Sequence, residues 1–166
     1  MQGIDELLRK NTKAKFDTDD IKFDQMTQKI TVETYRQDKL YSKVVHATTV
    51  LLKDSDEISP VAILTQIGDL APQSLDAWRH GRIPYLEKVF QGSLSKANRY
   101  LLIIGFHAHD LNMIPFHHTY CQIGKKNKLH FTHSCNPDIE NSYARHFRWN
   151  QSQEKKQELI KQALIK

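Results

Sequence analysis

The chain has 166 residues, 39% hydrophobic and 26% charged, with a net charge of +5 when histidine is neutral. This composition is typical of one globular domain with its own core, and no run approaches the roughly 20 apolar residues that span a bilayer. Two cysteines, Cys121 and Cys135, are too few for a disulfide scaffold, and the first residues lack the apolar stretch of a secretory signal. We therefore expect a cytoplasmic protein with reduced thiols, no membrane partner and no cofactor.

The positive charge is concentrated in the second half of the chain. Residues 1–60 contain 10 basic and 11 acidic side chains, whereas residues 79–148 contain 10 basic and 4 acidic ones together with eight of the nine histidines. A basic region of this kind favours an anionic partner, most simply a nucleic acid. The alternative interpretation is an ordinary solvated surface.

The two ends of the chain are predicted to flank one domain. Residues 1–28 are polar with scattered apolar anchors, which predicts a loosely ordered arm. A single globular domain is expected over 29–150. Residues 151–166 have Leu159, Ala163 and Leu164 on one face and lysines on the other, which predicts a C-terminal helix.

The domain begins with apolar residues at helical spacing from Val32 to Leu51, which predict an amphipathic helix to about Lys53. Three short helices are predicted next, in the segment that begins at Ser59 and includes Glu87. Residues that typically start or end helices recur along it up to Gly92. A good N-cap with proline at the first helical position opens such a helix, and glycine tolerates the backbone conformation that ends one. The residues predicted to start or end these helices are Ser59, Pro60, Gly68, Pro72, Gly81, Pro84 and Gly92.

A fourth helix is predicted from Ser93 or Ser95 to about Leu111. Segments 119–123 and 129–132 are rich in β-branched and aromatic residues and flank a basic turn, which predicts a β-hairpin. A short helix is expected over 139–147. The predicted fold class is α+β, mostly helical, with a helix-turn-helix-like bundle followed by a C-terminal β-hairpin and short helices.

The first two short helices outline a helix-turn-helix, in which the second helix lies in a DNA groove. Glutamine and arginine read base edges there, and lysines contact phosphates. We therefore expect a DNA-binding protein, most simply a small regulator of duplex DNA or a mobile-element accessory protein. The predicted nucleic-acid-binding residues are Gln73, Ser74, Arg79, Arg82, Lys88, Arg99, Lys125, Lys126 and Lys128.

The segment APQSLDAWRHGRIP resembles the second-helix region of Cro/repressor-type helix-turn-helix domains, which implies DNA binding. It departs from their pattern in a turn one residue longer and in the acidic Asp76. A longer stretch is similar to an uncharacterised bacterial family with a Trp-Arg-x-Gly-Arg-(Val/Ile)-Pro-Tyr-Leu-Glu run and a Pro-(Asp/Asn)-Ile-Glu-x-x-Tyr-Ala-x-His run. These correspond to 78–87 and 137–146. This second resemblance implies no function.

A metal site, a nuclease and a protein-interaction module are the other interpretations to weigh. The histidines and cysteines between His107 and Cys135 show no spacing of an established zinc module, so no metal is predicted. A small nuclease would use His117 or His118 as base, with Lys125 or Arg145 on the phosphate. The helices could instead form a protein-interaction module without nucleic acid. Whether the protein is an enzyme is left open, with a binding protein favoured.

Overall fold

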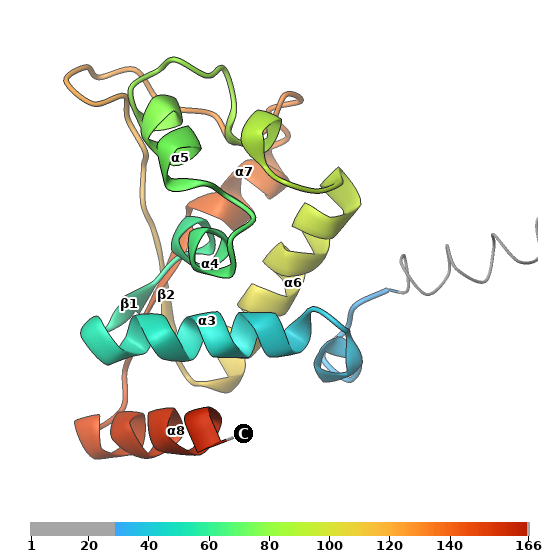
Figure 1. Ribbon diagram of the computed structural model, residues 1–166, viewed down its shortest axis with the longest axis vertical. Coiled ribbons are helices and arrows are strands. Elements are labelled where there is room, and N and C mark those ends of the chain that lie inside the picture. Colours follow the sequence, from blue (N-terminus) through green and yellow to red (C-terminus); the bar gives the residue numbers. More distant parts are fainter. Residues whose placement is uncertain (1–28, 166) are drawn as a thin grey trace, which may run out of the picture.

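The computed structural model describes residues 29–165 (Figure 1). The predicted arm, residues 1–28, lies outside this range. In chain order the elements are η1 (Tyr35–Gln37), α3 (Tyr41–Asp54), β1 (Glu57–Ile58), α4 (Pro60–Ile67), α5 (Pro72–Arg79), η2 (Leu86–Val89), α6 (Leu94–Asp110), β2 (Ile114–His117), α7 (Pro137–Ala144), β3 (Arg145–Arg148) and α8 (Gln153–Ile165). Six helices and one small sheet confirm the α+β, mostly helical class. None of the described helices is both long and apolar enough to span a bilayer.

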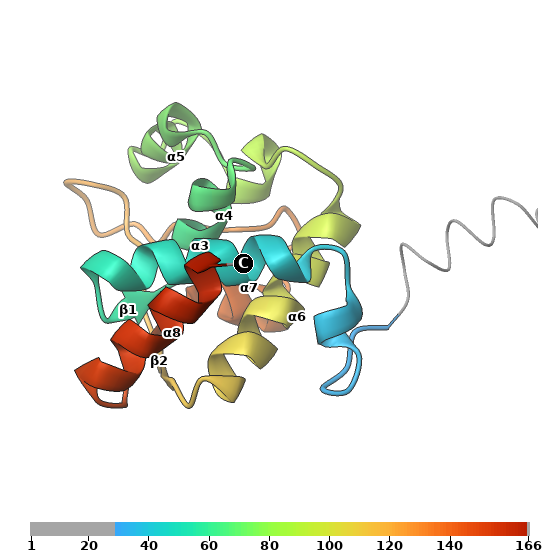
Figure 2. The ribbon, with the colours of Figure 1, turned by 60° about the horizontal axis from the view of Figure 1, so that its bottom comes forward.

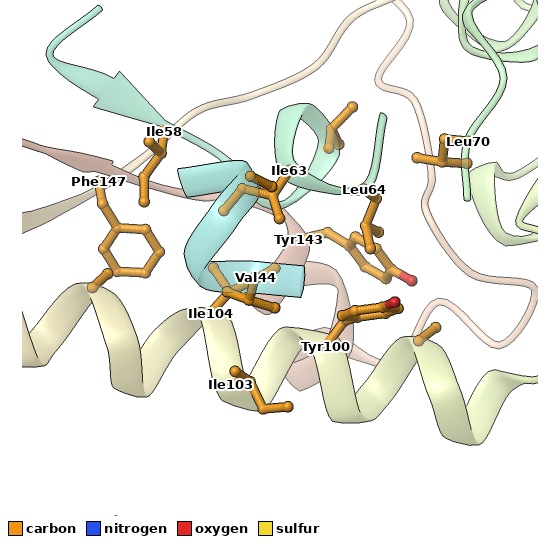
Figure 3. Packing of buried hydrophobic residues seen from close by; sticks show 14 of the residues in the cluster. Val44, Ile58, Ile63, Leu64, Leu70, Tyr100, Ile103, Ile104, Tyr143 and Phe147 are labelled. Carbon is orange, nitrogen blue, oxygen red and sulfur yellow. The ribbon is translucent and has the colours of Figure 1, made fainter. Parts of the chain in front are cut away.

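The hydrophobic core lies where α3, α4, α6 and α7 meet. Buried aliphatic side chains from these helices and two tyrosine rings fill it, and the inner face of the sheet closes one side (Figure 3). Burial of such side chains is the main favourable term in folding. The labelled members are Val44, Ile58, Ile63, Leu64, Leu70, Tyr100, Ile103, Ile104, Tyr143 and Phe147.

The helix boundaries with strong local signals form as predicted. The Ser59 hydroxyl accepts a hydrogen bond from the Ala62 amide at 3.1 Å, and the helix ends at Gly68 with φ +103°. The Ser93 hydroxyl caps α6 by accepting from the Lys96 amide at 3.1 Å. These features confirm the predicted starts of α4 and α6. The third short helix forms only as the 3₁₀ turn η2.

The three-stranded sheet has the order β1-β3-β2 and is antiparallel throughout. β3 follows α7 directly, so the prediction of a helix to residue 147 was wrong beyond Ala144. Residues 145–147 adopt an extended backbone in place of the predicted helix, because β3 pairs with β1 on one side and with β2 on the other. Ile58 and Phe147 are register partners and point into the core.

The predicted β-hairpin at 119–132 was wrong in detail. Only one isolated bridge, Cys121 with Lys128, links its two halves. The segment instead runs past α5 as irregular chain (Figure 1). Two backbone hydrogen bonds flank this bridge, from the Gln122 amide to the Asn127 carbonyl and from the Leu129 amide to the Tyr120 carbonyl, and other backbone groups of the segment bond to α5 and η2.

The C-terminal helix α8 packs against α3, at the end of the molecule away from α5 (Figure 2). Its lysines do not all face solvent, which corrects that prediction. Lys156 is only 4% exposed, and its ammonium group donates to the Asp56 carboxylate at 2.7 Å and to the Ser55 carbonyl at 2.9 Å. This contact ties α8 to the chain just before β1.

Candidate nucleic-acid interface

Trp78 joins α5 to the irregular segment 118–135. Its buried indole ring lies 5.5 Å from the Tyr120 ring and 5.3 Å from the Phe131 ring, between centroids. The indole Nε1–H donates to the His130 carbonyl at 2.8 Å. A buried tryptophan combines a large apolar surface with one donor that needs a partner. The segment is therefore fixed against the C-terminal half of α5.

A second contact brings the basic loop close to the end of this helix. The Ile123 amide donates to the Arg79 carbonyl at 2.9 Å. Gly81 has φ +78°, and a Cβ there would lie 2.5 Å from the Gln122 side chain. Glycine thus allows both the turn and the close approach. The cations at and just after the end of α5 and those of the loop are all exposed, and we call them together the basic face: Arg79, Arg82, Lys125, Lys126 and Lys128.

The far end of the segment is held by a buried carboxylate. Glu140 of α7 accepts from the Phe131 amide at 3.1 Å and from the Thr132 amide and hydroxyl at 2.8 and 2.7 Å. The amides of Leu86 and Glu87 donate to the carbonyls of residues 130 and 131. Burial raises the pKa of Glu87, whose carboxylate accepts from the Tyr143 hydroxyl at 2.7 Å. The loop is therefore anchored from α5, η2 and α7.

The basic face has little acidic compensation. Residues 118–133 contain three lysines and no aspartate or glutamate. Asp76, the one acidic residue of α5, is exposed, and its carboxylate lies 3.5 Å from Nδ1 of His80. Such a surface attracts polyanions, because their phosphates gain Coulomb energy and release counterions.

The other predicted binding residues are placed differently. Gln73 is exposed and Ser74 half-buried near the start of α5, and Lys88 is exposed on η2. Arg99 is not part of the basic face. Its guanidinium pairs with the Asp38 carboxylate, and only 12% and 5% of the two side chains are exposed. Arg99 therefore joins α6 to the turn before α3.

The histidines proposed for catalysis are separated by the sheet. His117 and Arg145 are register partners of β2 and β3, and with Asn141 they line a shallow pocket of about 350 Å³. His118 instead stacks on His146, with 4.6 Å between ring centroids. Lys125 lies in the loop of the basic face. The structure thus brings together His117 and Arg145.

His146 lies in a partly buried aromatic environment. Its Nε2 is 2.8 Å from the Tyr120 hydroxyl, and a hydrogen bond joins the two groups. Burial, and secondarily repulsion from His118, lower the pKa of His146 to about 4. The imidazole is therefore neutral near pH 7, because desolvation disfavours its charged form.

The cysteines and remaining histidines offer no metal centre in the part of the chain that the structure describes. Cys135 Sγ lies 3.6 Å from Nδ1 of His130, and the Glu140 carboxylate is 3.7 Å from the same nitrogen. Across residues 29–165, no three or more histidine, cysteine, aspartate or glutamate side chains are arranged to hold a metal ion. Cys121 and Cys135 are both exposed thiols.

Sequence reasoning missed Phe116, His146 and Arg148 as surface residues of a sheet. The signal was present in the alternation of Phe116 with His118 and of His146 with Arg148, which places each pair on one face of a strand. Comparisons of the chain with protein-family models, curated proteins and solved structures find no match. The function is therefore inferred from the geometry and charge of the site.

Proposed function

We propose that the protein binds nucleic acid through the basic face. One observation carries the proposal: the contact of Trp78 with the segment 118–135 fixes the loop of three exposed lysines against the end of α5, where the exposed Arg79 and Arg82 lie. Neither element alone has more than three of these cations. Several cations on a rigid support neutralise adjacent phosphates together, which gives sequence-independent affinity.

The test is binding of labelled oligonucleotides by fluorescence anisotropy across a salt series, with duplex DNA, single-stranded DNA and RNA as separate arms. The wild-type protein should bind at low salt and lose affinity steeply as salt rises. A Lys125→Gln/Lys126→Gln/Lys128→Gln variant should lower the slope of log K against log salt by about 0.7–0.9 per lysine that contacts phosphate. Arg79→Gln/Arg82→Gln should weaken binding in the same way.

A charge-matched control comes from the opposite end of the molecule. Lys53, Lys155 and Lys161 are exposed on α3 and α8, and their replacement by glutamine removes the same net charge. This control variant should bind nearly as the wild type does. Equal losses in both triple variants would reduce the effect to net charge, and no binding at low salt would contradict the proposal.

A second candidate function, phosphodiester cleavage, is supported by the pocket of His117, Asn141 and Arg145. An imidazole there could take the proton of an attacking water while the guanidinium holds the phosphate, and the leaving oxygen would take its proton from solvent. Incubation of end-labelled RNA and DNA with wild type and His117→Ala tests it. Cleavage that the variant lacks supports this function, and intact substrate with wild type contradicts it.

A further inference from the structure

The solvent face of the sheet carries a row of flat side chains, which we call the ring strip: Arg148, Phe116, His146 and His118. The Arg148 guanidinium lies 4.9 Å from the centre of the Phe116 ring. The Phe116 and His146 rings are 5.5 Å apart, and His146 and His118 stack at 4.6 Å with planes 23° apart. The strip is thus continuous along its length.

Strand register turns these side chains outward. Phe116 is the cross-strand partner of His146, and successive side chains on a strand point to opposite faces. Phe147, next to His146, is buried in the core, so His146 lies on the other face. His118 and Arg148 are exposed, and Phe116 is half-buried. An aromatic side chain on the open face of a sheet is available to a ligand.

The ring strip runs into the basic face. The His118 ring lies 4.7 Å from the Tyr120 ring, and Tyr120 packs in turn on Trp78 at 5.5 Å. The Arg79 guanidinium lies 6.0 Å from the centre of the Tyr120 ring. Arg79, an exposed cation of the basic face, is therefore separated from the strip by a single buried ring, that of Tyr120.

We propose that the ring strip binds the bases of a single-stranded nucleic acid whose phosphates contact the basic face. The inference rests on the proposed function and specifies that the nucleic acid is single-stranded. Unpaired bases stack on aromatic rings and guanidinium planes, and on the surface of a sheet they do so without disrupting the fold. The bases of a duplex are stacked on one another, so a duplex offers phosphates to the basic face and leaves the strip unused.

The chemistry of the strip fits stacking. His146 is neutral near pH 7, so its ring acts there as an aromatic surface, and Arg148 supplies a planar cation next to Phe116. Glu57, the register partner of Arg148, accepts a hydrogen bond from its guanidinium at 3.0 Å. Planar groups with one nearby cation are the composition that binds bases with little sequence preference.

The experiment compares two labelled probes, an oligothymidine of about 15 nucleotides, long enough for a site of this kind, and a hairpin duplex of similar charge. The variant Phe116→Leu/His118→Ala removes two rings and keeps apolar bulk at the half-buried position. It should bind oligothymidine about tenfold more weakly and the duplex as the wild type does. Ile114→Ala is the matched control, because Ile114 is exposed on the same strand and has no ring.

A second readout follows stacking directly. An oligonucleotide that contains 2-aminopurine should change fluorescence on binding to the wild type and to Ile114→Ala, and much less with the ring-strip variant. Thermal melting of all three proteins confirms that they are folded. If the variant binds oligothymidine as tightly as the wild type, or if the wild type prefers the duplex, the inference is overturned while the proposed function stands. Absence of any nucleic-acid binding overturns both.

Discussion

Two regions of the molecule are built by different means. The core between α3, α4, α6 and α7 is filled mainly by aliphatic side chains that interlock without directional contacts (Figure 3). The second region, which we call the cap, comprises α5, η2 and residues 118–135. It is held by a few rings and by side chains that bond to main-chain groups, chiefly Trp78 and Glu140. A core of the first kind tolerates apolar exchange, whereas the cap depends on individual residues.

The largest expected effect comes from removal of the ring that joins α5 to residues 118–135 within the cap. Trp78→Ala should lower the free energy of unfolding by about 3–5 kcal/mol, because a fully buried indole is replaced by a cavity. Hydrogen exchange should show loss of protection first at the amides of Ile123 and Leu129, while those of α6 stay protected. Urea unfolding and exchange by mass spectrometry measure both quantities.

Trp78→Phe separates the two roles of the indole. It keeps one aromatic ring, and it removes the pyrrole part of the indole together with the hydrogen bond to the His130 carbonyl, which also accepts from the Leu86 amide. A loss of about 1 kcal/mol is expected. Equal loss of protection in cap and core for Trp78→Ala would show that the two regions unfold as one unit.

The stability of the core should decrease at acidic pH. His107 of α6 is 6% exposed, and burial lowers its pKa to about 4. Above pH 6.5 both folded and unfolded states are neutral at this residue and stability is complete. As pH falls from 6.5 toward 4 the unfolded state binds the proton first, and roughly 3 kcal/mol of stability is lost at most.

Urea titrations at several pH values test this expectation. His107→Leu should flatten the decline between pH 6.5 and 4, whereas replacement of the exposed His109 on the same helix should not. Other titrating groups, such as Glu87 and His146, are present in all three proteins and cancel in the comparison. An unchanged decline in His107→Leu would contradict the assignment.

A smaller effect is expected from the carboxylate that anchors the cap. Glu140→Gln exchanges an anion that accepts three hydrogen bonds for an amide with one acceptor oxygen, and should cost about 2 kcal/mol. Exchange at residues 131 and 132 should increase. Glu158→Gln, an exposed position on α8, is the control for lost charge and should change stability little.

The smallest change in stability should accompany the largest gain in affinity. Arg148 and Glu57 form an exposed ion pair at 3.0 Å, worth at most about 1 kcal/mol. Glu57→Gln frees the guanidinium, and oligothymidine should then bind up to about fivefold more tightly. Asp110→Asn breaks a comparably exposed pair with Arg36 at 2.7 Å and should leave affinity unchanged. Equal or weaker binding of oligothymidine by Glu57→Gln would contradict this expectation.

Local signals in the sequence predicted most helices, and long-range contacts decided the rest. Ser59, Gly68 and Ser93 cap helices through hydrogen bonds with backbone groups three or four residues away, so the local sequence is enough to predict their roles. The sheet was missed because both strands that pair with β3, β1 and β2, lie far before it in the chain. The predicted hairpin is reduced to the bridge between Cys121 and Lys128, since the neighbouring Ile123 amide donates to the Arg79 carbonyl of α5.

Exposure of the candidate cations could be anticipated better than their partners. Arg79 and Arg82 were named from the helix-turn-helix pattern and the loop lysines from charge, and all five are exposed. Arg99 has the same charge but a buried partner, Asp38, which lies 61 residues earlier and gives no local signal. Lys156 likewise pairs with an acidic side chain, Asp56, that lies 100 residues away in the sequence. Charge is visible in a sequence, whereas the partner that neutralises it is a property of the fold.

The loop tip 123–128 is a replaceable part of the molecule. Its side chains are all exposed, and the anchors on either side, Tyr120 and Leu129, are buried. Length and composition between those anchors can therefore change while the frame stays intact, in the way that loops on rigid scaffolds tolerate insertion and carry function. Libraries randomised over these six positions are a direct route to variants with altered ligand preference at constant stability.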